Sequence, residues 1–339
     1  MKKIIVDVMG ADRPAAELVK GAVLAEKEYG ANLVLVGDGS QIEKAVADNG
    51  GDLSKFTVVH TDSVVTMEDD PMSIRRLKAD SSMGTGLKIL AAGEGDAFVS
   101  TGNTGALFAG AYLFVRKIAD VTRPAIASLI PTKNPLLLLY SGANVELTPD
   151  CLLQFGIMGK VYMNTIFGRE NPRVGLLNNG AEKSKGTPLE VEGYKILSSC
   201  PDINFVGNIE ANKVFFDACD VLVTDGFTGN ILLKSLEGMG KFMGQSLKGI
   251  FGASFRTKMS YLLVKDGVND FKKKFDASEH GGAPILGLTK PVIKAHGSSD
   301  AIAFKNAIRQ AISFADKDLT AKFTEEFARI KSRGAAEQA

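Results

Sequence analysis

Five short glycine-rich segments, each directly after an apolar run, hold many of the side chains that could bind an anion. They are DVMGAD (7–12), STGNTGA (100–106), SGANVELTP (141–149), NNGAEKSKGT (178–187) and TDGFTGN (224–230). A glycine turn at the start of a helix presents backbone N–H groups and the positive end of the helix dipole, which suit phosphate. Because Asn, Lys and Thr are concentrated in these turns, the sequence favours a site for phosphate or a phosphorylated substrate.

Three residues in or beside predicted strand ends are predicted to be catalytic. Lys185 is the first choice for the cation that binds phosphate, and the alternative is a surface lysine. Asn230 could donate a hydrogen bond to phosphate or to an oxyanion, and the alternative is a helix cap. His296 ends a predicted strand and could act as a general acid or bind phosphate, and the alternative is a structural histidine.

The predicted phosphate-binding residues come from the same turns. Asn103 has the same two interpretations as Asn230, Asp225 could orient one of these amides, and Arg123 is a weaker candidate that could simply anchor a turn. The full set is Asn103, Thr104, Gly105, Asn144, Asp225, Gly226 and Gly229.

Short runs rich in Val, Ile and Leu alternate with helical segments and must position these turns. The predicted strands are 2–7, 32–37, 56–61, 96–101, 124–131, 135–141, 172–178, 204–209, 220–225 and 291–296. The predicted helices are 15–29, 103–117, 149–167, 187–198, 229–251 and 300–330. This alternation is typical of a mostly parallel sheet with helices on both faces, here in one domain over 1–335 with a helical excursion near 230–280. The five turns should then meet at the carboxyl edge of the sheet.

Composition excludes several classes of protein. With 45% hydrophobic and 23% charged residues, the chain is globular rather than disordered. Lys and Arg (40) balance Asp and Glu (39), so no overall charge favours nucleic acid. Three scattered cysteines and three scattered histidines predict neither a disulfide nor a metal site, and they fit a cytoplasmic location. The GxGxxG and GxxxxGK(S/T) motifs are missing, so no nucleotide cofactor is expected.

Read together, several motifs resemble those of the acyl-carrier-protein:phosphate acyltransferases, the PlsX family of bacterial phospholipid synthesis. They are STGNTGA, RPAIASLIPT, SGAN, PRVGLLNNGAEKSKGT, NFVGNIE, DVLVTDGFTGNILLKSLEG, GGAPILGL and VIKAHGSSD. The resemblance covers nearly the whole chain. It implies a three-layer α/β/α fold like that of isocitrate and isopropylmalate dehydrogenases and of phosphotransacetylases.

The same resemblance implies a homodimer that transfers a long-chain fatty acyl group from acyl-carrier protein to inorganic phosphate, giving acyl phosphate for phospholipid synthesis. It implies no metal and no cofactor. One departure stands out: family members usually carry Asp two residues before the glycine of GAN, and this chain carries Tyr140.

This reaction needs little acid–base help from the protein. A thiolate with a thiol pKa of about 8.5 leaves without a strong acid, so the protein must mainly position phosphate and supply donors to the oxyanion. Two alternatives stay open: a phosphotransacetylase-like enzyme that uses coenzyme A, and a non-catalytic scaffold that binds phosphate or acyl phosphate.

Two amphipathic segments predict contacts outside the domain. The apolar stripe of 229–251 is longer than one sheet requires, so we expect part of it at a two-fold interface; the alternative is that all of it packs on the sheet. A short helix over 255–264, capped by Ser254, places Phe255, Met259, Leu262 and Leu263 on one face.

The segment 255–275 carries six basic and two acidic residues, which together with that apolar face suits the surface of an anionic bilayer. We expect peripheral contact on the inner face of the membrane; the alternative is a dimer-arm helix with solvated lysines.

Overall fold

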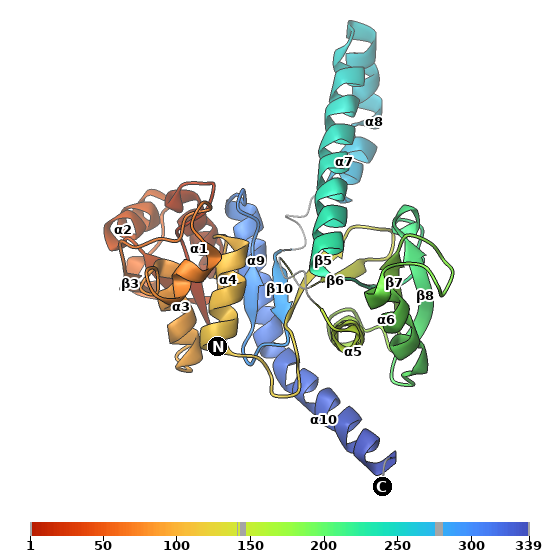
Figure 1. The fold of residues 1–339 in the computed structure, drawn as a ribbon. Helices are drawn as coiled ribbons and strands as arrows, with labels where there is room; N and C mark the ends of the chain where they lie inside the picture. The colour runs from red at the N-terminus through yellow and green to blue at the C-terminus, as the bar shows by residue number, and fades with distance from the viewer. Residues whose placement is uncertain (1, 141, 143–146, 275–280, 338–339) are drawn as a thin grey trace.

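The computed structural model describes residues 2–140, 142, 147–274 and 281–337. These residues form one eleven-stranded mixed sheet with helices on both faces, so the predicted α/β/α fold class is confirmed (Figure 1). The strand order is β3-β2-β1-β4-β11-β10-β5-β6-β9-β7-β8.

The first half of the sheet is parallel and contains β1 (Lys3–Asp7), β2 (Asn32–Gly37), β3 (Phe56–His60), β4 (Ala97–Ser100) and β11 (Val292–Lys294). Neighbouring residues of a strand point to opposite faces. In β1, Ile4 packs in one apolar core with residues of α1 (Ala15–Tyr29) and α9 (Ala301–Asp316), and Ile5 packs in the other with α3 (Ser82–Ala91) and α4 (Thr104–Gly110).

The second half contains β5 (Ala125–Ile130), β6 (Leu136–Tyr140), β7 (Arg173–Asn178), β8 (Asn204–Glu210) and β9 (Val221–Val223), with α5 (Pro149–Phe167) and α6 (Pro188–Ser199). The ten predicted strands are all present. The sequence prediction missed β10 (Ala283–Leu286), which joins the halves and is antiparallel to both β11 and β5. Because β5 and β6 are also antiparallel, β6, β7, β8 and β9 run opposite to β1–β4.

Two helices form an arm that projects from the body, namely α7 (Gly226–Gly252) and α8 (Phe255–Lys274) (Figure 1). The hydroxyl of Ser254 accepts a hydrogen bond from the Thr257 N–H at 3.2 Å, so the predicted cap is confirmed. The predicted end of the second helix at residue 264 is wrong, because the helical pattern continues for ten more residues along α7.

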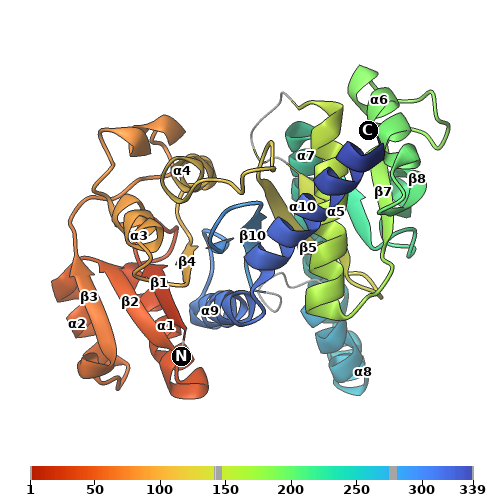
Figure 2. The same cartoon turned by 90° about the horizontal axis from the view of Figure 1, so that it is seen from below.

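The C-terminal helical segment is two helices rather than the single one predicted. α9 ends at Asp316, and Asp318 has φ of +47°, a left-handed conformation that breaks the helix before α10 (Leu319–Glu337). Figure 2 shows α10 lying beside α5. The sequence prediction also missed α2 (Gly39–Asp48) and α3.

The remaining elements are short helical turns. They are η1 (Leu53–Lys55), η2 (Pro71–Arg75), η3 (Ala111–Val115, a π-helical turn that continues α4) and η4 (Ala211–Lys213). Among the residues that the structure describes, no helix is long and apolar enough to cross a bilayer.

Candidate active site

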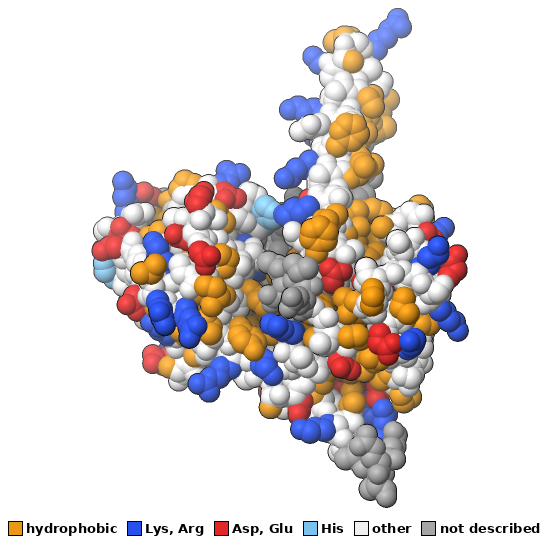
Figure 3. All heavy atoms as spheres, viewed as in Figure 1, with side chains coloured by type: hydrophobic (Ala, Val, Ile, Leu, Met, Phe, Trp, Pro, Cys, Tyr) orange, Lys and Arg blue, Asp and Glu red, His pale blue; other side chains and the backbone are white. Residues whose placement is uncertain are grey.

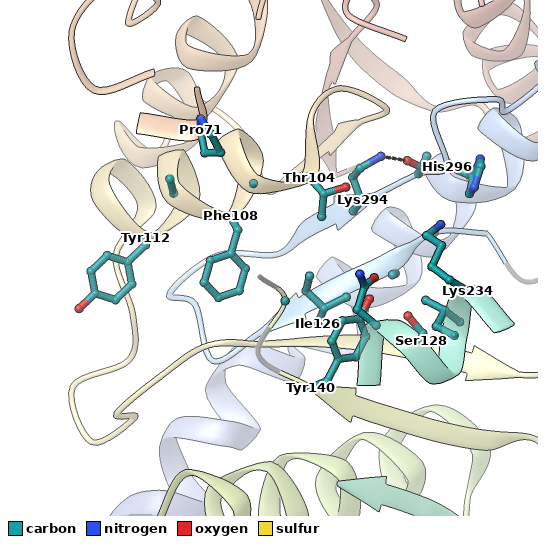
Figure 4. Close-up of a pocket in the computed structure, with 18 of the residues that line it drawn as sticks. Pro71, Thr104, Phe108, Tyr112, Ile126, Ser128, Tyr140, Lys234, Lys294 and His296 are labelled. Atoms are coloured by element: carbon teal, nitrogen blue, oxygen red, sulfur yellow. Dashed lines mark hydrogen bonds between the residues drawn. The ribbon is translucent and has the colours of Figure 1, made fainter. Parts of the chain in front are cut away.

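A cleft of about 740 Å³ lies between the two halves, where β10 meets β5. Its walls come from α4, β5, β6, the first turns of α7 and the strands β10 and β11. Thr104, Asn230, Lys234, Lys294 and His296 provide polar groups in this cleft, and Figure 4 shows Lys234, Lys294 and His296 on one side of it.

Lys294 ends β11 and is only 9% exposed, although it borders the cleft. Its Nζ donates to the Thr101 carbonyl at 3.0 Å and also to the Ala295 carbonyl. Burial lowers the pKa of Lys294 to about 8, against the opposing attraction of Asp12 and Asp7. The sequence prediction missed this residue; the available signal was a lysine inside an apolar strand.

Asp7 is a buried carboxyl group at the end of β1 that interacts with the Lys294 cation. Its Oδ2 accepts a hydrogen bond from Ser100 Oγ at 2.7 Å, and its Oδ1 accepts one from the Met9 N–H at 3.1 Å. Burial raises the pKa of Asp7 to about 6, because it outweighs these hydrogen bonds and the attraction of Lys294. Asp7 therefore attracts the Lys294 cation from behind the cleft, although less strongly than Asp12 does.

His296 lines the cleft two residues after Lys294, as the sequence predicted for a site residue. Its Nδ1 accepts a hydrogen bond from the Ser298 N–H at 3.1 Å, which leaves Nε2 to carry the proton of the neutral ring. Partial desolvation in the cleft lowers the pKa of His296; Glu237 opposes this effect, and the nearby Lys234 and Lys294 add to it. A neutral His296 can therefore donate from Nε2.

Lys234, on the third turn of α7, is another cation of the cleft that the sequence prediction missed. It forms an ion pair with Glu237 at 2.8 Å, and its side chain is 59% exposed. An exposed pair of this kind contributes little to stability. Lys234 is thus free to exchange Glu237 for an anionic substrate at little cost.

Asn230 lines the cleft on the first turn of α7, and it is not the helix cap. The cap is Asp225, whose Oδ1 accepts from the N–H groups of Phe227 and Thr228 at 2.8 and 2.9 Å. Gly226 and Gly229 are buried in the same turn. The structure therefore brings Asn230 into the cleft and gives Asp225 a structural role.

Asn103 caps α4, and both the oxygen and the nitrogen of its side-chain amide form hydrogen bonds with backbone groups. Its Oδ1 accepts from the Ala106 N–H at 3.1 Å, and its Nδ2 donates to the carbonyls of Thr66 and Met67 at 3.3 and 3.2 Å. The helix-cap alternative is thus what the structure shows for Asn103. Thr104 and Gly105, the next two residues, do line the cleft.

Lys185 is exposed in the loop between β7 and α6, and it is not among the residues that line the cleft. The order β6-β9-β7 places β7 two strands from β6, a lateral distance of roughly 10 Å. The expected meeting of all five glycine turns is therefore not what the structure shows. Asn144 lies outside the described residues, whereas its neighbour Gly142 borders the cleft.

Tyr140 forms part of the cleft floor at the end of β6 and is 5% exposed. Burial raises the pKa of its phenol, and a hydrogen bond with Ser128 opposes this effect. A Cβ added at Gly229 would lie 2.6 Å from the Cβ of Tyr140, so the start of α7 packs directly on the tyrosine. Tyr140 is therefore built into the site.

The arrangement suits a reaction that gathers negative charge beside an apolar group. Lys234, Lys294 and Arg123, the weaker candidate of the sequence analysis, supply cations. His296 and Asn230 supply neutral donors, and the apolar surface comes from Phe108, Tyr112, Ile126 and Leu129. Within the described residues, no group of three or more His, Cys, Asp or Glu side chains is placed to hold a metal ion.

The fold is similar to that of solved phosphotransacetylases and of a phosphate dehydrogenase. A phosphotransacetylase from Streptococcus pyogenes superposes with a TM-score of 0.63 at 18% identity, covering 93% of this chain and 94% of that one. The 4-hydroxythreonine-4-phosphate dehydrogenase of Klebsiella pneumoniae superposes with a TM-score of 0.55 at 12% identity, covering 93% and 100%. At these identities the likeness concerns the fold alone.

Sequence comparison gives the family. Residues 2–322 match the family model described as fatty acid synthesis protein. A phosphate acyltransferase of Thermoanaerobacterium thermosaccharolyticum is 41% identical over 325 residues, 96% of each chain. One of Clostridioides difficile is 43% identical over 314 residues, 92% of each chain. The chain belongs to this phosphate acyltransferase family, as its motifs predicted, and is an enzyme of the acyltransferase class.

Proposed function

We propose that the enzyme transfers a long-chain fatty acyl group from acyl-carrier protein to inorganic phosphate, giving acyl phosphate for phospholipid synthesis. The observation that carries this proposal is one cleft in which cations and neutral donors adjoin an apolar wall. The names of its relatives support phosphate as the acceptor.

In this reaction a phosphate oxygen attacks the thioester carbonyl carbon. The new C–O bond forms as the C–S bond breaks, and the carrier leaves as a thiolate that takes up a proton from water or from a donor in the cleft. Lys234 and Lys294 would hold the phosphate anion, and the Nε2–H of His296 or the amide of Asn230 would donate to the oxyanion. Positioning and charge stabilisation supply the catalysis.

The identity of the acyl donor distinguishes this proposal from a phosphotransacetylase-like enzyme. We expect kcat/KM with long-chain acyl-carrier protein to exceed that with acetyl-coenzyme A, because an acetyl group leaves the apolar wall unused. A preference for acetyl-coenzyme A would identify the alternative enzyme, and binding of phosphate without turnover of either donor would identify a scaffold.

Two alanine variants test the predicted polar residues. Asn230→Ala and Lys185→Ala are each expected to lower turnover at least tenfold, about 1.4 kcal/mol of transition-state stabilisation, with little change in melting temperature. For Lys185 this result requires that the loop 179–187 approach the cleft when substrate binds. Lys183→Ala, in the same loop, is the matched control. A normal rate for Lys185→Ala would confine phosphate binding to the cations of the cleft.

We also propose that α7 contributes to a two-fold dimer interface. Of its 27 residues, the buried ones are Gly226, Gly229 and Leu232, so the alternative in which the whole stripe packs on the sheet is wrong. Met239, Phe242 and Ile250 are 54%, 65% and 59% exposed, which leaves apolar surface for a partner.

At the tip of the arm, we propose peripheral contact with an anionic membrane. Phe255, Met259, Leu262 and Leu263 are 78%, 50%, 62% and 89% exposed, and Figure 3 shows hydrophobic side chains along this arm. Basic residues flank them, so the binding should be reversible and salt-sensitive.

Sedimentation with anionic vesicles tests the membrane proposal. The double variant Leu262→Glu/Leu263→Glu should lose most of the binding seen for the wild type at low salt, because two charges would enter the apolar contact. Leu77→Glu changes an equally exposed leucine (88%) on the body and should bind normally. Equal binding by the double variant and wild type, or no binding by wild type at low salt, would contradict the proposal.

A further inference from the structure

The cleft is asymmetric along its length. Lys294 marks the polar end of the cleft. In the sheet it pairs with Ser100 of β4 and with Ala283 of β10. Because β4 ends at Ser100 and α4 begins at Thr104, the polar end of the cleft lies close to the start of α4. From there α4 runs away from the cations, and Thr104, Phe108 and Tyr112 follow one another at four-residue spacing along the cleft wall. The sequence between Thr104 and Tyr112, GALFAGA, carries no charge.

The strand β5, opposite α4, contributes both a polar and an apolar side chain to the cleft. In β5, Ser128 and Ile126 are two residues apart on one face of the strand, and both line the cleft. Tyr140 lies beside both residues, because it pairs with Ile126 in the sheet and hydrogen-bonds Ser128. Ile126 and Phe108 both approach Gly142: a Cβ added there would be 3.1 Å from Ile126 Cδ1 and 3.8 Å from Phe108 Cδ2. Figure 4 shows Phe108 and Tyr112 on the side away from His296 and Lys234.

We infer that the channel between α4 and β5, from Thr104 past Phe108 to Tyr112, holds the acyl chain and that Phe108 and Tyr112 set the chain length accepted. This inference rests on the proposed function and assigns its apolar substrate group to one wall. The eight residue-to-residue steps from Thr104 to Tyr112 rise about 12 Å. With C–C bonds of ~1.5 Å, that length takes roughly ten carbon–carbon bonds of an extended chain.

The end of the channel explains how longer chains could be accepted. Tyr112 is 37% exposed, and Met72, which also lines the cleft, is 50% exposed. The channel therefore opens to solvent beside Tyr112 instead of ending in a closed wall. Tyr112 lies in η3, a π-helical turn, and such turns are often found at functional sites.

The chain contains no tryptophan, so a single tryptophan introduced into the channel would be the only source of tryptophan emission. The same substitution narrows the channel. In Phe108→Trp, we expect the tryptophan emission to move to shorter wavelength when a long-chain fatty acid is added, but not when acetate or inorganic phosphate is added. Phe216→Trp, at a position that is 76% exposed on the other half, is the matched control and should not respond.

Kinetics give the second measurement. Phe108→Trp should lower kcat/KM for long-chain relative to medium-chain acyl-carrier protein, by about fourfold for each methylene forced out, the equivalent of ~0.8 kcal/mol per CH₂. Its KM for phosphate should stay close to that of the wild type. Tyr112→Ala, which widens the open end, should shift the preference toward longer chains. Melting temperatures show that the variants are folded.

The outcomes separate this inference from the proposed function. An unchanged chain-length profile in Phe108→Trp, with no emission response to fatty acid, would overturn the channel while leaving acyl transfer intact. A shift in the profile with Leu233→Trp alone would also overturn it, because the chain would then lie along α7. An emission response in an enzyme that transfers no acyl group from any donor would support the channel and refute the proposed function.

Discussion

Replacing Lys294 by methionine is expected to lower kcat/KM by about 100- to 1,000-fold, because the change removes a preorganised cation that would hold the phosphate, and losing one preorganised charge-stabilising group typically has an effect of this size. Methionine keeps most of the length of the side chain and removes the charged amine. The melting temperature should change little, because the variant no longer buries a charge but also loses the hydrogen bonds to the Thr101 and Ala295 carbonyls. Lys290→Met, four residues earlier and outside the cleft lining, is the control and should remain active.

The pH profile separates a catalytic Lys294 from a structural one. The protonated lysine binds the anion, so kcat/KM should fall as the pH rises through the pKa of Lys294, about 8, and Lys294→Met should lack this limb. Asp7 stabilises the cation, so Asp7→Asn should move the limb to lower pH. An alkaline limb that is identical in wild type, Asp7→Asn and Lys294→Met would remove Lys294 from the mechanism.

Adding one methyl group at Gly229 should destabilise the enzyme by about 1–3 kcal/mol, the usual range for overpacking. The new Cβ would lie 2.6 Å from Tyr140 Cβ and 2.9 Å from Thr224 Cγ2, and neither atom is at the end of a flexible side chain. The start of α7 must then shift, which also displaces Asn230. Thermal unfolding of Gly229→Ala measures the effect on stability.

Gly238→Ala in the same helix is the matched control. No atom outside the local helix backbone lies within 4 Å of its added Cβ, and alanine is favoured over glycine in helices by about 0.5–1 kcal/mol. Its melting temperature should therefore stay the same or rise. Equal melting temperatures for the two variants would show that the contact between α7 and Tyr140 is looser than the structure indicates.

Local patterns were sufficient to predict most elements of the fold. Runs of Val, Ile and Leu predicted ten strands, and apolar periodicity predicted α1 and α5 to the residue. The strand β10 was missed because GGAPILGL holds only four strand residues between glycines. The direction of half the sheet reverses at the antiparallel pair of β5 and β6, and such pairing is a long-range property that spacing along the chain does not show.

Local patterns also predicted part of the site, whereas the residues that depend on strand order were missed or misplaced. Thr104, Gly105, Asn230 and His296 line the cleft and come shortly after the ends of β4, β9 and β11, so the turns after these strands located them. Lys185 follows β7, whose distance from the cleft depends on strand order. Lys294 was missed because a lysine inside PVIKAH could equally lie on an exposed edge strand. Its burial follows only from the position of β11 in the interior of the sheet.

The most direct test of the account is product analysis with chelator-treated enzyme, long-chain acyl-carrier protein and inorganic phosphate. We predict acyl phosphate, trapped with hydroxylamine and identified by mass, in a one-to-one ratio with free carrier thiol. Folded enzyme that releases no acyl phosphate, or that releases thiol together with free fatty acid only, would contradict the account.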